Sequence, residues 1–286
     1  MSESITLFSP AKLNLFFRVL RSREDSFHEI ASLFQSISLG DILHISLSEK
    51  EELFCSDPSI PVDEKNLVLK AVRLFQKKTG LSFQVKIDLQ KSIPVQSGMG
   101  GGSSNAATTL WGLNELFKTN FTTKQLQEIS SEIGSDVPFF FSLGTAYCKG
   151  RGEKVENLDP LPQKALWIAK PAYGLGTPEV YRNCNPSGFL ARDPKQVLKL
   201  HYEGEPLYFN DLETSAFELS PPLAKLKDQL LQSGFKSAVM TGSGTAFFCF
   251  GEKNKALIPG VDFFPVHFLN REKEKWYREQ EYDIIH

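Results

Sequence analysis

The sequence predicts an α+β protein, because helical and strand patterns are mixed along it without alternating strictly. Residues 83–89 alternate between apolar and polar side chains, which is the period of a half-buried strand. Between residues 106 and 117, apolar side chains recur at the spacing of one helix face. A doubly wound parallel sheet would need strands and helices in regular succession, and the rest of the chain does not provide it.

Strand patterns dominate the first part of the chain. Residues 5–9 and 13–20 are two apolar stretches of strand length, and a polar loop follows them. Residues 43–47 alternate, so we expect a further strand there. Residues 67–75 place apolar side chains at helical spacing, and Gly80 is expected to end that helix.

Another helix is predicted from Thr122, which together with Gln125 resembles a capping box, and Gly134 is expected to end it.

Two prolines near residue 160 mark a connection, so we expect two domains, at residues 1–157 and 158–286. The elements expected in the second are a strand at 165–169, a short helix from Pro178, a helix from Pro221 to Gly234, strands at 237–240 and 246–250, and a charged, solvent-exposed helix at 271–283.

The composition predicts a soluble cytoplasmic protein that binds neither nucleic acid nor membranes. The 286 residues are 41% hydrophobic, and a net charge of −2 leaves no broad basic surface for nucleic acid. Four cysteines lie far apart without a CxxC pair, which is typical of buried thiols in a reducing compartment. The first residues resemble no signal peptide, and no apolar run reaches the length of a membrane span. We expect a monomer or a weak homodimer.

The stretch at residues 93–110, IPVQSGMGGGSSNAATTL, predicts an anion site. Glycine fills four of the five positions 98–102, and Ser103 or Ser104 is expected to cap the helix that follows. Such a loop lets a ligand approach the main chain, and the first helical turn offers unpaired N–H groups and the positive end of the dipole. The motifs of Walker A loops, dinucleotide loops and protein kinases are absent.

Two further stretches place charged side chains next to apolar ones. PAKLNLFFRV, at residues 10–19, puts Lys12 and Asn14 on one face of an extended segment, where an unpaired lysine would be costly to bury. In GSDVPFFF, at residues 134–141, Asp136 follows a helix end and precedes an apolar run that we expect to be a strand.

PAKLNL, PVQSGMGGGSSNAA, GSDVPFF and TGSGTAFF occur in that order, and together they resemble the GHMP small-molecule kinases. The resemblance implies a two-domain α+β GHMP kinase fold, with an N-terminal domain related to ribosomal protein S5 domain 2. SREDSFHEI, at residues 22–30, is similar to the R-x-D-G-Y-H-x-L signature of one branch of that family. It implies transfer of the γ-phosphate of ATP to the 2-hydroxyl of a methylerythritol that carries a cytidine diphosphate group, a step of non-mevalonate isoprenoid biosynthesis.

The resemblance also implies roles for individual residues. Asp136 would be the catalytic residue that accepts or orients the proton of the attacking hydroxyl, and Lys12 would keep Asp136 ionised and polarise the reacting groups. Mg²⁺ is expected with ATP, but no ligands are assigned to it. The residues expected at ATP are Asn66, Pro94, Gly98, Gly100, Gly101, Gly102, Ser103, Ser104 and Asn105. Those expected at the acceptor are Asn14, Phe27, His28, Lys91, Thr177, Tyr181, Gly242, Ser243 and Gly244.

Several of these residues have structural interpretations as well. Asn66 can equally be interpreted as a helix cap, and Tyr181 as part of the core. Ser104 or Asn105 can also be interpreted as a helix cap. Phe27 stands where the family commonly has tyrosine, which keeps the ring for stacking and loses the hydroxyl. The glycine loop also has unusual residues, namely Gln96, Ser97 and Met99.

Two alternative functions remain open at this point. One is another GHMP kinase, of the mevalonate, homoserine or galactose type, whose substrates carry no base for His28 to bind. The other is a catalytically inactive GHMP-fold protein that binds a nucleotide or sugar. The presence of both Lys12 and Asp136 argues against this second alternative.

Overall fold

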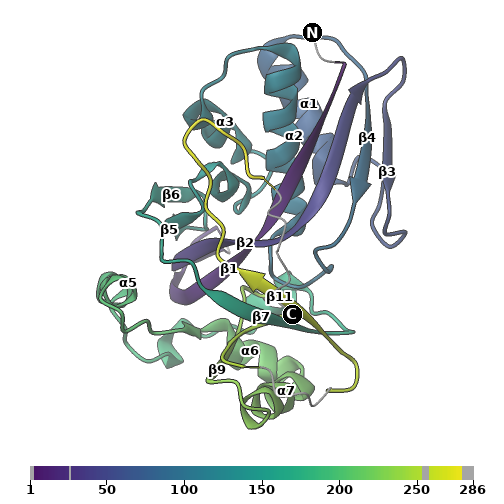
Figure 1. Ribbon diagram of the computed structural model, residues 1–286. Coiled ribbons are helices and arrows are strands. Elements are labelled where there is room, and N and C mark those ends of the chain that lie inside the picture. The colour runs from purple at the N-terminus through teal and green to yellow at the C-terminus, as the bar shows by residue number, and fades with distance from the viewer. Residues whose placement is uncertain (1–2, 26, 253–257, 279–286) are drawn as a thin grey trace.

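The computed structural model describes residues 3–25, 27–252 and 258–278, and it has the mixed α+β architecture that the sequence predicts (Figure 1). The first sheet is built around two long antiparallel strands, β1 (Ser4–Ser22) and β2 (His28–Leu47). Its strands follow the order β3-β4-β2-β1-β8, and β5 pairs with the other end of β2 and with β6. The remaining strands are β3 (Glu52–Cys55), β4 (Val85–Gln90), β5 (Thr145–Gly150), β6 (Lys154–Asn157) and β8 (Phe209–Asn210).

The two strands expected at residues 5–9 and 13–20 are one continuous strand, so that boundary was wrong. Pro10 does not end the strand because the pairing of β1 with β2 shifts register between Pro10 and Ala11, which accommodates it at an irregularity. A second register shift falls between Asn14 and Phe16, in the middle of the motif that contains Lys12.

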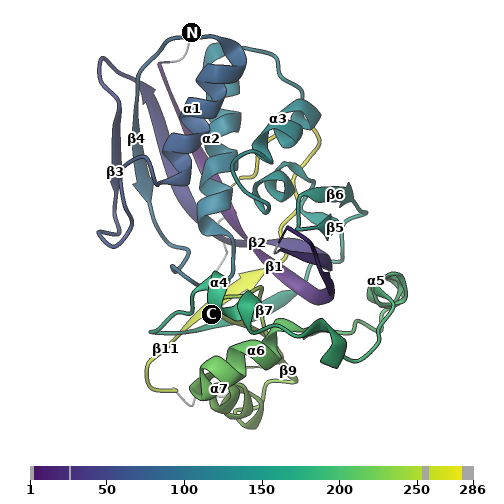
Figure 2. The ribbon, with the colours of Figure 1, turned by 180° about the vertical axis from the view of Figure 1, so that it is seen from behind.

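Helices α1 (Leu67–Thr79) and α2 (Gly101–Phe117) lie side by side on one face of the first sheet (Figures 1 and 2). Gly80 ends α1 in the left-handed conformation, as predicted. The capping box of Thr122 and Gln125 is also confirmed, at the start of α3 (Thr123–Ser130). That helix ends before the expected Gly134, and the strand expected after Asp136 is a 3-10 helix, η1 (Val137–Phe141). Pro138 fits its first turn, where its missing N–H is not needed.

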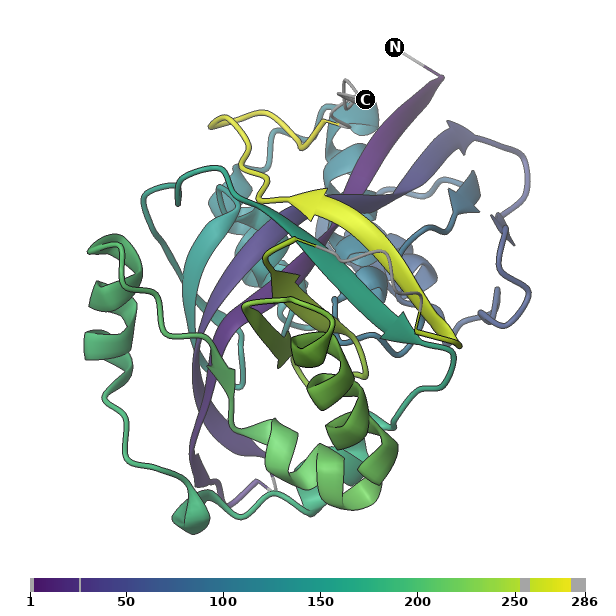
Figure 3. The same cartoon turned by 60° about the horizontal axis from the view of Figure 1, so that its bottom comes forward.

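The second sheet is antiparallel, in the order β11-β7-β10-β9. Helices α6 and α7 pack against one of its faces (Figure 3), and they share a buried core with it. The strands are β7 (Ala165–Pro171), β9 (Ser237–Met240), β10 (Phe247–Phe250) and β11 (Val261–His267). The helices of this half are α4 (Thr177–Arg182), η2 (Pro186–Gly188), α5 (Pro194–Tyr202), α6 (Leu212–Leu219) and α7 (Pro221–Gln232).

The two sheets are joined by a common core and by segments that cross between them. Leu13 and Ile37 of the first sheet belong to the same buried cluster as Ile168 and Phe248 of the second. The short strand β8 leaves the second half of the chain and pairs in parallel with β1. The division at residues 157 and 158 therefore stays a prediction, with segments of the second half in contact with the first sheet.

The charged segment after residue 270 does not form the predicted helix where the structure describes it, through residue 278; residues 279–283 of that prediction lie outside the described residues. Arg271, Trp276 and Tyr277 are buried rather than solvated. The indole N–H of Trp276 donates a hydrogen bond of 2.8 Å to the backbone oxygen of Phe8 on β1. Trp276 and Tyr277 thus anchor this segment, although its many charged residues had suggested an exposed helix. No helix among the described residues has the length and apolar character needed to cross a membrane.

The glycine loop between β4 and α2 packs backbone to backbone on the turn between β9 and β10. A Cβ atom at Gly98 would lie 2.0 Å from the backbone oxygen of Thr241, and one at Gly244 would lie 2.0 Å from the nitrogen of Gly98. The N–H of Thr245 donates a hydrogen bond of 3.2 Å to the oxygen of Gln96. Only glycine permits this approach, so these two glycine-rich motifs hold the two halves together.

This contact predicts a specific loss of stability. Gly244→Ala would insert a methyl group against fixed backbone atoms, and we expect it to lower the free energy of unfolding by about 1–3 kcal/mol, as overpacking commonly does. Gly188→Ala is the control, because nothing lies within 4 Å of the added Cβ. Urea unfolding monitored by circular dichroism measures both. Equal stability of the two variants would contradict the close contact.

Candidate active site

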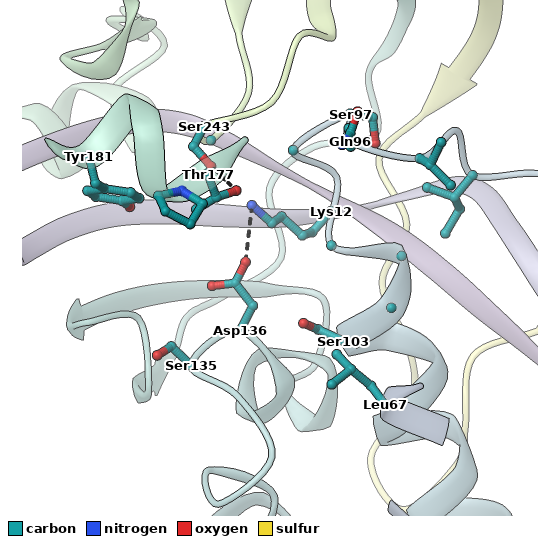
Figure 4. A pocket seen from close by; sticks show the side chains of 18 of the residues that line it. Lys12, Leu67, Gln96, Ser97, Ser103, Ser135, Asp136, Thr177, Tyr181 and Ser243 are labelled. Atoms are coloured by element: carbon teal, nitrogen blue, oxygen red, sulfur yellow. Dashed lines mark hydrogen bonds and ion pairs between the residues drawn. The ribbon is translucent and has the colours of Figure 1, made fainter. Parts of the chain in front are cut away.

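A cavity of about 1090 Å³ lies where the glycine loop, strands β1 and β2, the loop before η1 and helix α4 meet. All of the site residues proposed from the sequence line it except Asn14, Ser104 and Gly244. Figure 4 shows Tyr181 on one side, Lys12 and Asp136 between, and Leu67 with Ser103 on the other side. The cavity is therefore large enough for two ligands placed on either side of the lysine and the aspartate.

The centre of the cavity is an ion pair between a buried lysine and a partly exposed aspartate. The Nζ atom of Lys12 lies 3.5 Å from Oδ2 of Asp136, and their side chains are 3% and 33% exposed. Burial lowers the pKa of Lys12, and the charge of Asp136 opposes that shift. The carboxylate that opposes the lowering of the Lys12 pKa is thus also the group that is open to the cavity.

The other neighbours of the Lys12 ammonium fix its position. It donates a hydrogen bond of 2.6 Å to Oδ1 of Asn14 and lies 4.9 Å from the centre of the Phe34 ring. The Asn14 amide donates to Ser32, and its backbone N–H donates to Thr241 at 3.1 Å. Asn14 is fully buried and does not line the cavity, so the structure places it behind Lys12 rather than beside an acceptor.

The glycine loop presents the N-terminus of α2 to the cavity. Gly100 caps the helix in the left-handed conformation, and the helix starts at Gly101, so the predicted caps Ser103 and Ser104 lie within the first turn instead. The first N–H groups of a helix have no partner inside it, and the residues that carry them here, Gly101, Gly102 and Ser103, line the cavity. A Cβ at Gly100 would lie 3.1 Å from the side chain of Lys12, which brings the loop against the Lys12–Asp136 ion pair.

Ser104 and Asn105 turn toward the protein interior. Ser104 accepts a hydrogen bond of 2.8 Å from Ser9, and Asn105 donates to Ser9 and to Asp41. Asp41, which the sequence reasoning missed, is fully buried and forms an ion pair with Lys91. Its carboxylate also accepts the backbone N–H groups of residues 92 and 93, so it supports the start of the glycine loop.

Lys91 lies beside the N-terminus of α2. Its ammonium is 3.2 Å from the position of a Cβ at Gly101, the first residue of α2. A lysine at that point adds positive charge to the helix N-terminus. The sequence had suggested a contact with the acceptor, and the structure instead brings Lys91 beside the residues proposed for ATP.

The side of the cavity beyond the glycine loop is lined by Pro61, Asn66, Leu67 and Pro94. Asn66 is the N-cap of α1: its side chain accepts the N–H of Val68 at 2.9 Å and donates to the oxygen of Pro61 at 2.7 Å. Both ends of this amide are therefore occupied by the backbone, and what the segment offers to a ligand is mainly apolar surface.

The opposite side is aromatic. The rings of His28 and Tyr181 are 5.4 Å apart, and the Nδ1 atom of His28 is buried without a hydrogen-bond partner among the described residues. Burial lowers the pKa of His28, so its imidazole is neutral at pH 7. Phe27 is half exposed, and the guanidinium of Arg151 lies 4.9 Å from its ring centre. Arg151 also lines the cavity, and no sequence signal singled it out.

Residues of the second half also line the cavity near the Lys12–Asp136 ion pair. The hydroxyls of Thr177, on α4, and Ser243, in the turn after β9, share a hydrogen bond of 2.8 Å. A Cβ at Gly242 would lie 3.3 Å from Nζ of Lys12. Gly244 does not face the cavity, because it packs against the glycine loop.

Comparisons with known proteins agree on one family. The sequence profile of the GHMP kinases N terminal domain matches residues 66–144, and that of the GHMP kinases C terminal domain matches residues 187–258. The chain is 51% identical, over 96% of its length and 93% of the relative, to a 4-diphosphocytidyl-2-C-methyl-D-erythritol kinase of Protochlamydia amoebophila. It is 41% identical, over 96% of its length and 72% of the relative, to the chloroplastic 4-diphosphocytidyl-2-C-methyl-D-erythritol kinase of Mentha piperita.

Solved structures agree with the sequence comparisons. A crystal structure of a 4-(cytidine 5'-diphospho)-2C-methyl-D-erythritol kinase matches 92% of this chain and 99% of its own, with a TM-score of 0.79 and 33% identity. A homoserine kinase from Cytophaga hutchinsonii matches 95% of this chain and 96% of its own, with a TM-score of 0.71 and 18% identity, and shows the fold alone. The chain belongs to the GHMP kinase family of ATP-dependent small-molecule kinases.

Proposed function

We propose that the chain transfers the γ-phosphate of ATP to the 2-hydroxyl of 4-diphosphocytidyl-2-C-methyl-D-erythritol, in non-mevalonate isoprenoid precursor biosynthesis. The observation that supports this acceptor is the aromatic side of the cavity, where neutral His28 stands next to the ring of Tyr181. A base can stack on such a ring and form hydrogen bonds with the imidazole. The 51% identical relative, named for the same activity, supports the same choice. Mevalonate and homoserine carry no base and would leave this side unused.

ATP is proposed to occupy the side of the glycine loop. Its adenine would lie on the apolar surface near Pro61 and Leu67, and its phosphates would accept the N–H groups at the start of α2. Lys91 would face the phosphates from behind the loop, held in place by Asp41. The proposed role of Ser104 changes accordingly, because its hydroxyl is bonded to Ser9 and would support the loop rather than touch phosphate.

In the proposed reaction, the acceptor hydroxyl gives its proton to a carboxylate oxygen of Asp136. Its oxygen forms a bond to the γ-phosphorus as the bond between that phosphorus and the leaving oxygen of ADP breaks. The Lys12 ammonium, 3.5 Å from Asp136, holds the carboxylate in place through their ion pair and neutralises charge on the moving phosphoryl group.

Mg²⁺ is proposed to enter with ATP. Among the described residues, no three His, Cys, Asp or Glu side chains gather in a way that could hold a metal ion. Mg²⁺ in kinases is commonly held by substrate phosphates, waters and only one or two carboxylates, so the oxygens of Asp136 and Ser103 at the cavity wall fit it. The ion would neutralise phosphate charge during transfer.

The cytoplasm is the proposed compartment, in keeping with four unpaired cysteines, and the oligomeric state stays a prediction.

The substrate assignment has a direct test. With ATP and Mg²⁺, we expect release of ADP to depend on 4-diphosphocytidyl-2-C-methyl-D-erythritol and to be negligible with mevalonate, homoserine or galactose. Omitting Mg²⁺ should remove the activity. A coupled ADP-release assay measures this, and NMR of the product locates the phosphate on the 2-hydroxyl. Faster turnover of an acceptor without a base would contradict the assignment, and ATP binding without turnover of any acceptor would favour an inactive binding protein.

The catalytic pair has its own prediction. Asp136→Asn should lower kcat by about 10²–10⁴-fold, because it removes the proton acceptor, and Lys12→Ala should lower it by about 10²–10³-fold, because it removes charge stabilisation. The matched controls are Asp262→Asn and Lys225→Ala, which change exposed residues that do not line the cavity. Steady-state kinetics on variants that stay folded by circular dichroism give the result. Near-normal kcat in either site variant would remove that residue from the reaction.

The aromatic side should control the acceptor alone. His28→Ala and Tyr181→Leu should each raise KM for the acceptor about tenfold or more, since stacking on an aromatic ring is worth about 1–3 kcal/mol per base. KM for ATP should stay within about twofold, and Tyr181→Phe, which keeps the ring, is the control. Because burial lowers the pKa of His28, KM for the acceptor should be constant above pH 6.5 and rise only below it. A parallel rise of KM for ATP would contradict a base-binding role.

A further inference from the structure

We propose that Arg271 is a positioning residue for the reaction, which holds Asp136 in place through the 3-10 helix η1. The inference rests on the catalytic role proposed for Asp136. Arg271 lies in the segment after β11, outside the cavity and outside both regions matched by the family profiles. Its side chain reaches the end of η1 that is opposite to Asp136.

The guanidinium of Arg271 binds the C-terminal end of η1. Its Nη2 atom donates a hydrogen bond of 2.6 Å to the oxygen of Phe141, and its Nε atom donates one of 2.7 Å to the oxygen of Ser142. These backbone oxygens are at the negative end of the short helix, where a cation is favoured. Arg271 is only 8% exposed, so water does not replace these bonds easily.

The segment that carries Arg271 is itself anchored. Nη1 of Arg271 donates a hydrogen bond of 2.7 Å to the oxygen of Lys275, which folds the segment around the guanidinium. The rings of Trp111, Trp276 and Tyr277 surround it at 5.6–5.9 Å. The Tyr277 hydroxyl donates to the oxygen of Ser142 at 3.3 Å. A charged group held in this way is fixed on all sides, as a positioning role requires.

The other end of η1 is the active site. Asp136 is its N-cap residue and makes no capping hydrogen bond with its side chain, which leaves the carboxylate to face Lys12. The ring of Phe139 lies 5.1 Å from that of Phe34, the ring beneath the Lys12 ammonium. A Cβ at Gly100 would lie 3.2 Å from the ring of Phe140. A movement of η1 would therefore displace Asp136, its N-cap residue, relative to Lys12 and the glycine loop.

Five residues of 3-10 helix are unstable by themselves, because their hydrogen bonds have poor geometry. Without Arg271 two buried backbone oxygens would lose a charged donor, and the helix would shift or fray to find other partners. A displacement of about 1 Å in a catalytic group can reduce a rate about 10²-fold. The consequence should fall on kcat rather than on binding.

The test is a double-mutant cycle with Asp136. Arg271→Ala should lower kcat about tenfold or more in the otherwise normal chain, with KM for ATP and for the acceptor within about twofold. In a chain that already carries Asp136→Asn, the same substitution should change the residual rate less than twofold, because the group that it positions is gone. Phosphate transfer from radiolabelled ATP measures the residual rates.

The control is Lys275→Ala, which removes an exposed cation from the same segment and keeps the backbone oxygen that Arg271 binds. We expect it to match the normal chain. If Arg271→Ala does not fold, Arg271→Lys and Tyr277→Phe replace it, since each keeps part of the contacts with Ser142. They should lower kcat by smaller factors, again only when Asp136 is present.

An equal loss in the two Asp136 backgrounds would indicate general destabilisation and would overturn the proposal, as would a change in KM alone or normal kinetics of Arg271→Ala. If the wild-type protein does not phosphorylate the cytidine diphosphate acceptor, that result would instead contradict the proposed function. The two failures are thus distinguishable in the same assay.

Discussion

The site depends on one buried positive charge. Burying the ammonium of Lys12 in a wall that includes the ring of Phe34 is unfavourable unless its charge is compensated. Asn14 supplies an oxygen from the same strand, and Asp136 supplies a carboxylate from a segment more than a hundred residues away. One ion pair therefore both compensates the buried charge of Lys12 and fixes the position of the Asp136 carboxylate. The strands, the loop and η1 are arranged so that these two groups meet.

Around that pair, two glycine-rich motifs bring the halves of the molecule into contact. The glycine loop and the turn at residues 241–245 touch through their main chains, and Gly98 and Gly244 have no room for a side chain. The same turn places Gly242 against Lys12 and Ser243 against Thr177. The contact therefore does more than join the sheets: it also brings residues of the second half to the cavity wall beside Lys12.

The sequence predicted the fold class, the capping box at Thr122 and the helix end at Gly80, because these depend on local patterns. It also named half of the residues that line the cavity, through the resemblance to a family. Asp41 was missed because a single acidic residue in a strand looks like any outward-facing polar residue until Lys91 is found beside it. The interior orientation of Ser104 and the burial of Arg271 depend on partners distant in sequence, which no local pattern reveals.

The strand that carries Lys12 takes its partners from segments that lie far apart in the chain. Its partner β8 begins at Phe209, and the oxygen of Phe8 receives its hydrogen bond from Trp276. Domains usually fold as units while the chain emerges from the ribosome. Here β1 meets Met99 at Lys12, but it lacks some of its hydrogen bonds until the segments that contain Phe209 and Trp276 have been made. A chain cut before Trp276 would therefore contain all four sequence motifs and still lack the hydrogen bond that β1 accepts at Phe8.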